Sequence, residues 1–390
     1  MVRLTLVPPP VATQFSPALL EPSFVLVHYS RLHFAPDQGK TVLQVWFESP
    51  AATLPAPEES DSVKTTLLKV RASLALAGLS LAVTAAVASA PPIFVLNSLE
   101  ANVSVIDPVT WTETARIPTG KEPHHLYLTP DEKSLIVANA LGDTLTFVDP
   151  QTAQIQRTVR GIVDPYHLRF SPDMKWFITA ANRLNHIDFY RWDGKDLSLV
   201  QRVATSRTPS HLWIDSRSTT VYSTMQDSDE LVAIDLATQK IKSRVKTGPM
   251  PADVYGSPDD KRVFVGLTGG DSVEVFDITG REPVSIKKIK TGNGAHAFRA
   301  AGDGKHLFVS NRVDNSISKL DMDTLQVVES YPVPGGPDCM EVSADGRFIY
   351  VSARWARKLS VVDTQAKKVV RQVPVGKSPH GVWTLQHAPR

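Results

Sequence analysis

Residues 119–149, TGKEPHHLYLTPDEKSLIVANALGDTLTFVD, decide how this chain folds. After an opening turn, the stretch predicts a strand over His124–Leu128, a Pro130-Asp131 turn and a second strand over Leu135–Asn139. A third strand ends at Asp149. Short runs of β-branched and aromatic residues separated by Gly, Pro and Asp are typical of hairpins. The stretch therefore predicts consecutive antiparallel strands.

The same pattern recurs along the chain in steps of 42 or 44 residues. The residue before the first strand of each unit is usually proline: Pro123, Pro165, Pro209, Pro251, Ala295, Pro337 and Pro379. The second strand of each unit ends at Asn97, Asn139, Ala181, Met225, Leu267, Asn311 and Ala353. Ten residues later comes a position that is usually aspartate: Asp107, Asp149, Arg191, Asp235, Asp277, Asp321 and Asp363. A period of about 40–45 residues is typical of a β-propeller, so we predict an all-β fold of seven blades with four antiparallel strands each.

The two ends of the repeat region complement each other. The region opens with Ile93–Asn97, the second strand of a unit whose first strand is missing. It ends with His380–Leu385, a first strand that no second strand follows. We therefore predict that the C-terminal strand closes the first blade, because a closed ring leaves no unpaired inner edge.

The sequence before residue 91 shows no such repeat. Residues 1–62 contain nine of the chain's 29 prolines without any period, and we expect a disordered leader that is not translated in the native protein. Residues 63–71 are basic, and the following apolar segment is rich in Leu and Ala and ends in an Ala-x-Ala pattern. This order is typical of a signal peptide, which we place at 63–88, ahead of a propeller over 91–390. The alternative is an uncleaved membrane anchor, since the apolar run approaches the ~20 residues that a spanning helix needs.

Composition excludes several classes of protein. The formal net charge is +2, so no overall field requires nucleic acid or an acidic partner. Cys339 is the single cysteine, which excludes an intramolecular disulfide and a zinc site built from cysteines. The sequence has no G-x-S-x-G, P-loop, H-E-x-x-H or C-x-x-C motif.

Several units resemble the YVTN-type propeller repeat. The matching segments are Phe308–Asn311, Ile136–Asn139, Val103–Asp107 and Thr119–Pro123. With the signal peptide, the chain is similar to the periplasmic YncE-like propeller family from residue 91 to the C-terminus. The resemblance implies a seven-bladed propeller that is periplasmic or secreted. It implies no particular function, because this architecture hosts binding proteins and enzymes alike.

Histidines gather at one repeat position. In a propeller, the loop that enters the innermost strand and the loop that leaves the second strand lie on the same face. The two positions after each residue of the proline set should therefore surround the channel mouth. They are His124 and His125, Tyr166 and His167, Ser210 and His211, Ala252 and Asp253, His296 and Ala297, Asp338 and Cys339, and His380 and Gly381. Six of the chain's 11 histidines occupy these fourteen positions.

Three interpretations of these histidines stay open. They are architectural if each hydrogen-bonds a neighbouring blade or its own turn, as buried polar groups must. They hold a transition metal if the imidazoles converge, since imidazole suits Zn, Cu and Fe. They bind an organic ligand, or act on it as acid and base, if they face an open site.

Arginines favour the organic-ligand interpretation, with an anionic ligand. Arg183, Arg312 and Arg354 follow the second strands of three units, and Trp355 is adjacent to the last. Arginine binds carboxylate or phosphate through two parallel hydrogen bonds, and tryptophan offers a face for stacking.

We therefore expect an exported, monomeric binding protein rather than an enzyme, with a small anionic or cofactor-like ligand at a His/Arg-lined mouth and no membrane span after signal cleavage. The first alternative is an enzyme, either a His- or metal-dependent lactonase or lyase or a quinoprotein-type oxidoreductase component with a quinone-type cofactor. The second is a scaffold that binds another periplasmic protein or single-stranded nucleic acid. The selected ligand-binding residues are His124, His125, His167, His211, Asp253, His296, His380, Arg183, Arg312, Arg354 and Trp355. The candidate metal ligands are His125, His167, His211 and His296.

Overall fold

The computed structural model describes residues 36–37, 40–41 and 90–389. The first two ranges are the short antiparallel strands β1 (Pro36–Asp37) and β2 (Lys40–Thr41). The predicted signal peptide and the rest of the predicted leader lie outside the described residues. Within the described part of the chain, no helix has the length and apolar character needed to cross a membrane.

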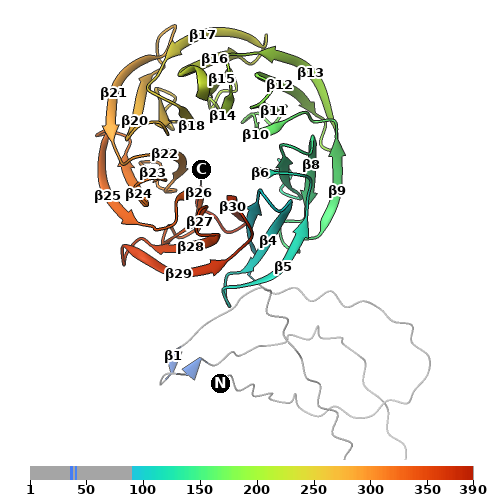
Figure 1. Ribbon diagram of the computed structural model, residues 1–390, viewed down its shortest axis with the longest axis vertical. Coiled ribbons are helices and arrows are strands. Elements are labelled where there is room, and N and C mark those ends of the chain that lie inside the picture. The colour runs from blue at the N-terminus through green and yellow to red at the C-terminus, as the bar shows by residue number, and fades with distance from the viewer. Residues whose placement is uncertain (1–35, 38–39, 42–89, 390) are drawn as a thin grey trace, which may run out of the picture. The chain divides into compact units, whose positions relative to one another are not determined.

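Residues 90–389 form a ring of seven four-stranded antiparallel sheets around a central channel (Figure 1). The innermost strands are β30 (Pro379–Thr384), β6 (Pro123–Leu128), β10 (Pro165–Phe170), β14 (Pro209–Ile214), β18 (Pro251–Gly256), β22 (Ala295–Ala300) and β26 (Pro337–Val342). The second strands are β3 (Ile93–Asn97), β7 (Leu135–Asn139), β11 (Trp176–Ala181), β15 (Thr220–Met225), β19 (Arg262–Leu267), β23 (His306–Asn311) and β27 (Phe348–Ala353). The predicted seven-bladed propeller is confirmed.

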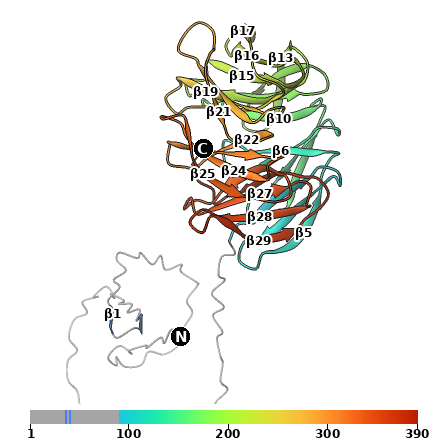
Figure 2. The same cartoon turned by 60° about the vertical axis from the view of Figure 1, so that its left-hand side comes forward.

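The outer half of each blade has the same plan. The third strands are β4 (Asn102–Asp107), β8 (Thr144–Val148), β12 (His186–Trp192), β16 (Glu230–Asp235), β20 (Ser272–Asp277), β24 (Ser316–Asp321) and β28 (Lys358–Asp363). The outermost are β5 (Thr112–Pro118), β9 (Ile155–Arg160), β13 (Leu197–Ala204), β17 (Lys240–Lys246), β21 (Val284–Lys290), β25 (Gln326–Pro332) and β29 (Lys368–Pro374). Figure 2 shows β6 and β22 in the middle of the ring and β5 and β29 on its outside. A short 3₁₀ helix (Gln226–Ser228) follows β15.

The C-terminal strand closes the ring, as the sequence predicts. Strand β30 pairs antiparallel with β3, with Phe94 opposite Trp383 and Ile93 opposite Thr384. The first blade therefore contains three strands from the start of the repeat region and one from its end. In Figure 1 the C-terminus lies near the centre of the ring, where β30 lines the channel.

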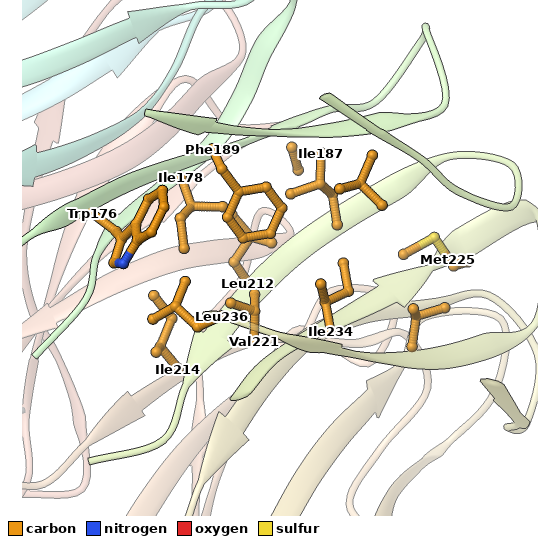
Figure 3. Close-up of a cluster of buried hydrophobic side chains, with 13 residues drawn as sticks. Trp176, Ile178, Ile187, Phe189, Leu212, Ile214, Val221, Met225, Ile234 and Leu236 are labelled. Atoms are coloured by element: carbon orange, nitrogen blue, oxygen red, sulfur yellow. The ribbon is translucent and has the colours of Figure 1, made fainter. Parts of the chain in front are cut away.

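Apolar clusters between neighbouring blades hold the ring together. Figure 3 shows the cluster between the third and fourth blades, where Phe189 and Ile187 of β12 face Leu212 of β14 and Val221 of β15. All four side chains are buried. Each such side chain contributes roughly 1.5–3 kcal/mol on burial, so a blade is stable only when both of its faces are covered.

Where the second strand of a blade ends in asparagine, that side chain stabilises the loop that follows. Asn139 Nδ2 donates to Thr144 Oγ1 at 3.0 Å and to Thr146 Oγ1 at 2.9 Å. Gly120 packs directly on Asn139, because an added Cβ at Gly120 would lie 2.7 Å from Asn139 Cβ. Gly292 packs on Asn311 in the same way, since an added Cβ there would lie 2.9 Å from Asn311 Cγ. The Thr-Gly turn of the repeat therefore needs glycine wherever asparagine ends the neighbouring strand.

The aspartates that lie ten residues after the end of the second strand cap the hairpin between the third and outermost strands. Asp149 Oδ1 accepts the backbone N–H groups of Gln151 and Thr152 at 2.9 and 2.8 Å, the local bonding that aspartate offers at turns. The exception is Arg191, where β12 runs on to Trp192. The Arg191 guanidinium carbon lies 3.6 Å from the centre of the Trp176 ring, and Asp193 caps the turn instead, as the Asp193-Gly194 pair predicts.

Each innermost strand has a register shift at its start. The pairing slips between Pro165 and His167, for example, and the other six blades slip at the equivalent place. In a regular strand, successive side chains point to opposite faces, so only one of two neighbours would face the channel. A bulge redirects a side chain. This irregularity lets both His124 and His125 reach the channel.

Candidate functional site

The six histidines of the repeat position meet in the channel, and all of them are buried. The ring centres of His125, His167 and His211 form a triangle with sides of 4.6, 4.7 and 4.8 Å. His124 stacks on His380 with 3.7 Å between ring centres. We name these six side chains the histidine cluster: His124, His125, His167, His211, His296 and His380.

Backbone carbonyls orient two rings of the histidine cluster. His125 Nδ1 donates to the carbonyl oxygen of Tyr166 at 2.8 Å, and His380 Nδ1 donates to that of His124 at 2.7 Å. A neutral imidazole that donates from Nδ1 keeps a lone pair on Nε2. Both rings therefore present Nε2 as an acceptor or as a metal ligand.

Two ring nitrogens of the histidine cluster face each other at hydrogen-bond distance. His125 Nε2 lies 3.0 Å from His211 Nε2. His211 also hydrogen-bonds the backbone of Ala252. His167 Nδ1 is buried and has no hydrogen-bond partner among the described residues. A buried nitrogen without a partner is costly, and a cation bound between these rings would relieve that cost.

The pKa values of the histidine cluster lie below the ordinary value. Burial is the largest cause at each ring, and neighbouring imidazoles add to it at His124, His125 and His167. The pKa of His211 falls to about 3 for the same reasons, with burial as the largest cause and the neighbouring imidazole of His296 as the next. The rings are therefore neutral at pH 7, the state in which imidazole coordinates a metal.

Asp338 is a buried carboxylate beside the histidine cluster. It accepts hydrogen bonds from Arg312 Nη2 at 2.6 Å and Arg354 Nη1 at 2.9 Å. His296 Nδ1 and His380 Nε2 lie 3.1 and 3.6 Å from its Oδ1. Burial by itself raises the pKa of Asp338, but Arg312, His380 and His296 outweigh it and hold the pKa well below the usual range.

The structure brings only some of the predicted residues together. Arg312 and Arg354 reach the histidine cluster, but both are bound to Asp338. Arg183 lies on the rim, where Nη2 donates to Glu122 Oε2 at 2.6 Å. The side chain of Trp355 is exposed and packs over Gly336.

Asp253 lines a chamber below the histidine cluster. Its Oδ1 and Oδ2 accept the N–H groups of Val254 and Phe298, each at 2.8 Å, and burial raises its pKa. The chamber has a volume of about 110 Å³ and is also lined by His125, His167 and His211. A small molecule in this chamber would therefore contact three imidazoles and a carboxyl group.

Sequence reasoning missed the next layer of the channel. Side chains two residues further along each innermost strand share the face of the histidine cluster, because strand side chains have a period of two. These residues are Tyr127, Arg169, Trp213, Tyr255, Arg299, Glu341 and Trp383. Counting two residues onward from His125, His167, His211 and their equivalents in the other units finds them.

Three overlapping groups of side chains fit a metal ion. In each, the ligand atoms lie within 4.8 Å of one another. The groups are His124, His125 and His380; His125, His167 and His211; and His296, Asp338 and His380. Cys339 contributes little, because burial and the Asp338 charge raise the pKa of its thiol well above the ordinary value. Neutral imidazole with at most one carboxylate is a donor set for zinc, copper or iron.

Comparison with known proteins identifies the family but no activity. A search of curated proteins finds no match. The Pseudomonas aeruginosa periplasmic gluconolactonase is 20% identical, with a TM-score of 0.65 over 75% of this chain and 98% of that one. A functionally unknown protein from Desulfotomaculum acetoxidans is 15% identical, with the same TM-score and the same coverage. Kuenenia stuttgartiensis hydrazine synthase is 19% identical, with a TM-score of 0.58 over 66% and 88% of the two chains.

At these identities, the solved structures share the fold alone with this chain. The family model is more specific, since the YNCE-like beta-propeller model matches residues 62–390. It spans every blade of the ring and includes the segments on which the sequence resemblance rests. The chain therefore belongs to the YncE-like β-propeller family.

Proposed function

We propose that this propeller binds a transition-metal ion through His125, His167 and His211. The observation that carries the proposal is the 3.0 Å approach of two Nε2 atoms, with His125 held in the tautomer that leaves its Nε2 unprotonated. In a tetrahedral site, metal–nitrogen bonds of about 2.0–2.1 Å place two ligand nitrogens about 3.3 Å apart. The pair His125 and His211 is already close to that spacing, and the ligand atoms of all three imidazoles lie within 4.8 Å of one another.

The surroundings support a neutral three-histidine site. Three protein ligands leave a fourth position free, and the chamber of about 110 Å³ lies beside these rings. The cationic groups nearby, Arg312 and Arg354, already bond Asp338, so they oppose a bound cation less than free guanidinium groups would. The same pairing is the reason that we rank an anionic ligand at the mouth below a metal.

Hydrolysis is the second candidate function. A small substrate in the chamber would lie beside the ion and beside Asp253, and the Pseudomonas neighbour is described as a gluconolactonase. We also propose a periplasmic location, supported by the signal-peptide pattern over 63–88 and by that neighbour's description as periplasmic. Gluconolactone hydrolysis by the metal-loaded protein, lost on removal of the metal, would establish the activity.

The test of metal binding uses the full chain, stripped with chelator and titrated with Zn²⁺ against a competing chelator dye. We expect stoichiometric uptake by the parent protein. His167→Asn removes a ring nitrogen that has no partner, so it should cost no hydrogen bond and weaken Zn²⁺ binding by at least roughly tenfold.

The matched control is His306→Asn, since His306 bonds Asp303 outside the channel. The control should bind Zn²⁺ like the parent. Absence of uptake in the parent, or equal losses in the two variants, would overturn the metal site and favour the architectural interpretation.

A further inference from the structure

The channel widens into a basin at the end opposite the histidine cluster. Its walls are the last residues of β6, β10, β14 and β18 and the turns that follow them. Those strands begin at the histidine end, so the basin opens on the other face of the ring. Its volume is about 530 Å³, within the roughly 300–1,000 Å³ range of small-molecule sites.

Aromatic rings of the second channel layer form the inner end of the basin. Tyr127, Trp213 and Tyr255 line both the basin and the chamber above it. Trp213 and Tyr255 pack with 4.6 Å between ring centres, and Trp213 is only partly buried. Gly256 makes room for the indole, because a Cβ there would lie 2.1 Å from Trp213 Nε1. The two rings are tilted at 47° to each other, and their surface is partly open to the basin.

One cation lies among these rings. The guanidinium carbon of Arg169 is 4.9 Å from the Trp213 ring centre and 5.9 Å from that of Tyr127. Its Nε donates to the carbonyl of Leu212 at 2.6 Å, which fixes the plane of the group. Among the described residues, no carboxylate forms an ion pair with Arg169.

The equivalent arginine of the sixth blade shows the contrast. Arg299 occupies the same repeat position but is buried, bonds Glu341 and donates to the carbonyls of Ala388 and Pro389. Arg299 therefore anchors the C-terminal tail. Arg169 has no such ion pair among the described residues, although its charge lowers the pKa of the buried Asp253. Arginine binds a carboxylate through two parallel hydrogen bonds.

We propose that this basin binds a planar organic acid, with an aromatic ring system stacked on Trp213 and Tyr127 and its carboxylate on Arg169. The acidic residues at the rim repel negative charge, so the ligand should carry a single carboxylate and hold it at the inner end, on Arg169. Glu132 is exposed there, and Asp260 accepts hydrogen bonds from the Ser216 N–H and hydroxyl. They would repel a polyanion such as nucleic acid. The proposal does not depend on the metal site.

The test compares 2-naphthoate with its neutral analogue 2-naphthamide by calorimetric titration of the full chain. The parent should bind naphthoate more tightly. Arg169→Gln should weaken naphthoate binding by at least roughly tenfold and leave naphthamide binding nearly unchanged, because only the carboxylate gains a charge-assisted hydrogen bond from arginine. Trp213→Leu should weaken both ligands.

Two controls locate the site. Lys175→Gln removes a positive charge from the same blade without touching the basin, and His167→Asn alters the channel above it. Both should bind naphthoate like the parent. The proposal is overturned if the parent binds neither ligand up to millimolar concentration, if it binds them equally, or if either control loses as much as Arg169→Gln. If Arg169→Gln fails to fold, two measurements decide: the preference of the parent for naphthoate over naphthamide, and the affinity of Trp213→Leu for both ligands.

Discussion

Single residues at the channel mouth show how burial sets protonation. Asp338 stays ionised because two guanidinium groups bond it, whereas the histidines stay neutral because burial outweighs the attraction of that carboxylate. The mouth thus combines the Asp338 carboxylate, which is paired with two arginines, with several uncharged imidazole nitrogens. A site of this kind favours a cation that bonds nitrogen over a ligand that needs imidazolium.

The lowered histidine pKa values predict how stability depends on pH. The unfolded chain takes up protons at about pH 6.5, but the folded chain does not, so protonation favours unfolding below that pH. Each buried ring should cost up to about 1.4 kcal/mol per pH unit in this range, and for His211 the window extends down to its folded pKa of about 3. The contribution of Asp338, whose pKa is also lowered, is lost only below the usual aspartate range.

The measurement is thermal melting of the metal-free protein between pH 7 and pH 5. We expect the melting temperature to fall as the pH falls, and to fall less steeply in His211→Asn, which removes one such ring. A melting temperature that stays constant over this range would mean that the folded protein accepts these protons, and the neutral cluster would be wrong.

How far sequence predicts the site depends on the residue. The repeat position located His124, His125, His167, His211, His296 and His380 within one cluster, because equivalent positions of a ring converge by symmetry. Sequence could not show which charges neutralise one another. The bond of Arg312 to Asp338 joins two neighbouring blades, and the bond of Arg354 to Asp338 lies within one blade. Both depend on side-chain reach, which spacing along the chain does not encode.

At the scale of elements, the structure explains why the repeat has asparagine and glycine at particular positions. Asparagine closes one loop by bonding the third strand, and the glycine of the Thr-Gly turn makes space above it. The strand ends are predictable to within a residue. Strand β6 begins at Pro123 rather than at the expected His124, and β8 ends at Val148 rather than at the expected Asp149. The bulges are not predictable, because they arise where seven strands crowd around a channel.

The contact between Gly120 and Asn139 gives a stability prediction. An alanine Cβ at residue 120 would lie 2.4 Å from Thr144 Oγ1, so Gly120→Ala should lower the free energy of unfolding by about 1–3 kcal/mol. Gly280→Ala is the control, because its nearest atom would be 3.8 Å away. Urea denaturation measures both. Equal stability of the two variants would show that the glycine is not required by the packing described here.

The whole molecule depends on one strand pairing between the ends of the repeat region. Strand β30 supplies the inner strand of the first blade, its Trp383 packs against Phe94, and its His380 belongs to the histidine cluster. Fold and site are therefore closed by the same six-residue segment. Removing it should affect both, whereas most changes at the mouth should affect only the site.

A chain that ends at Val375 tests this coupling. Its β3 would expose an unpaired apolar edge inside the ring, so we expect aggregation or loss of cooperative melting, and no Zn²⁺ uptake. A synthetic peptide of residues 376–390, added during refolding, supplies the missing strand without restoring the covalent link. It should recover solubility and metal uptake together, because both need β30 against β3. A truncated chain that stays soluble and melts like the parent would contradict the closure. Recovery of folding without metal uptake would instead keep the closure and remove the metal site.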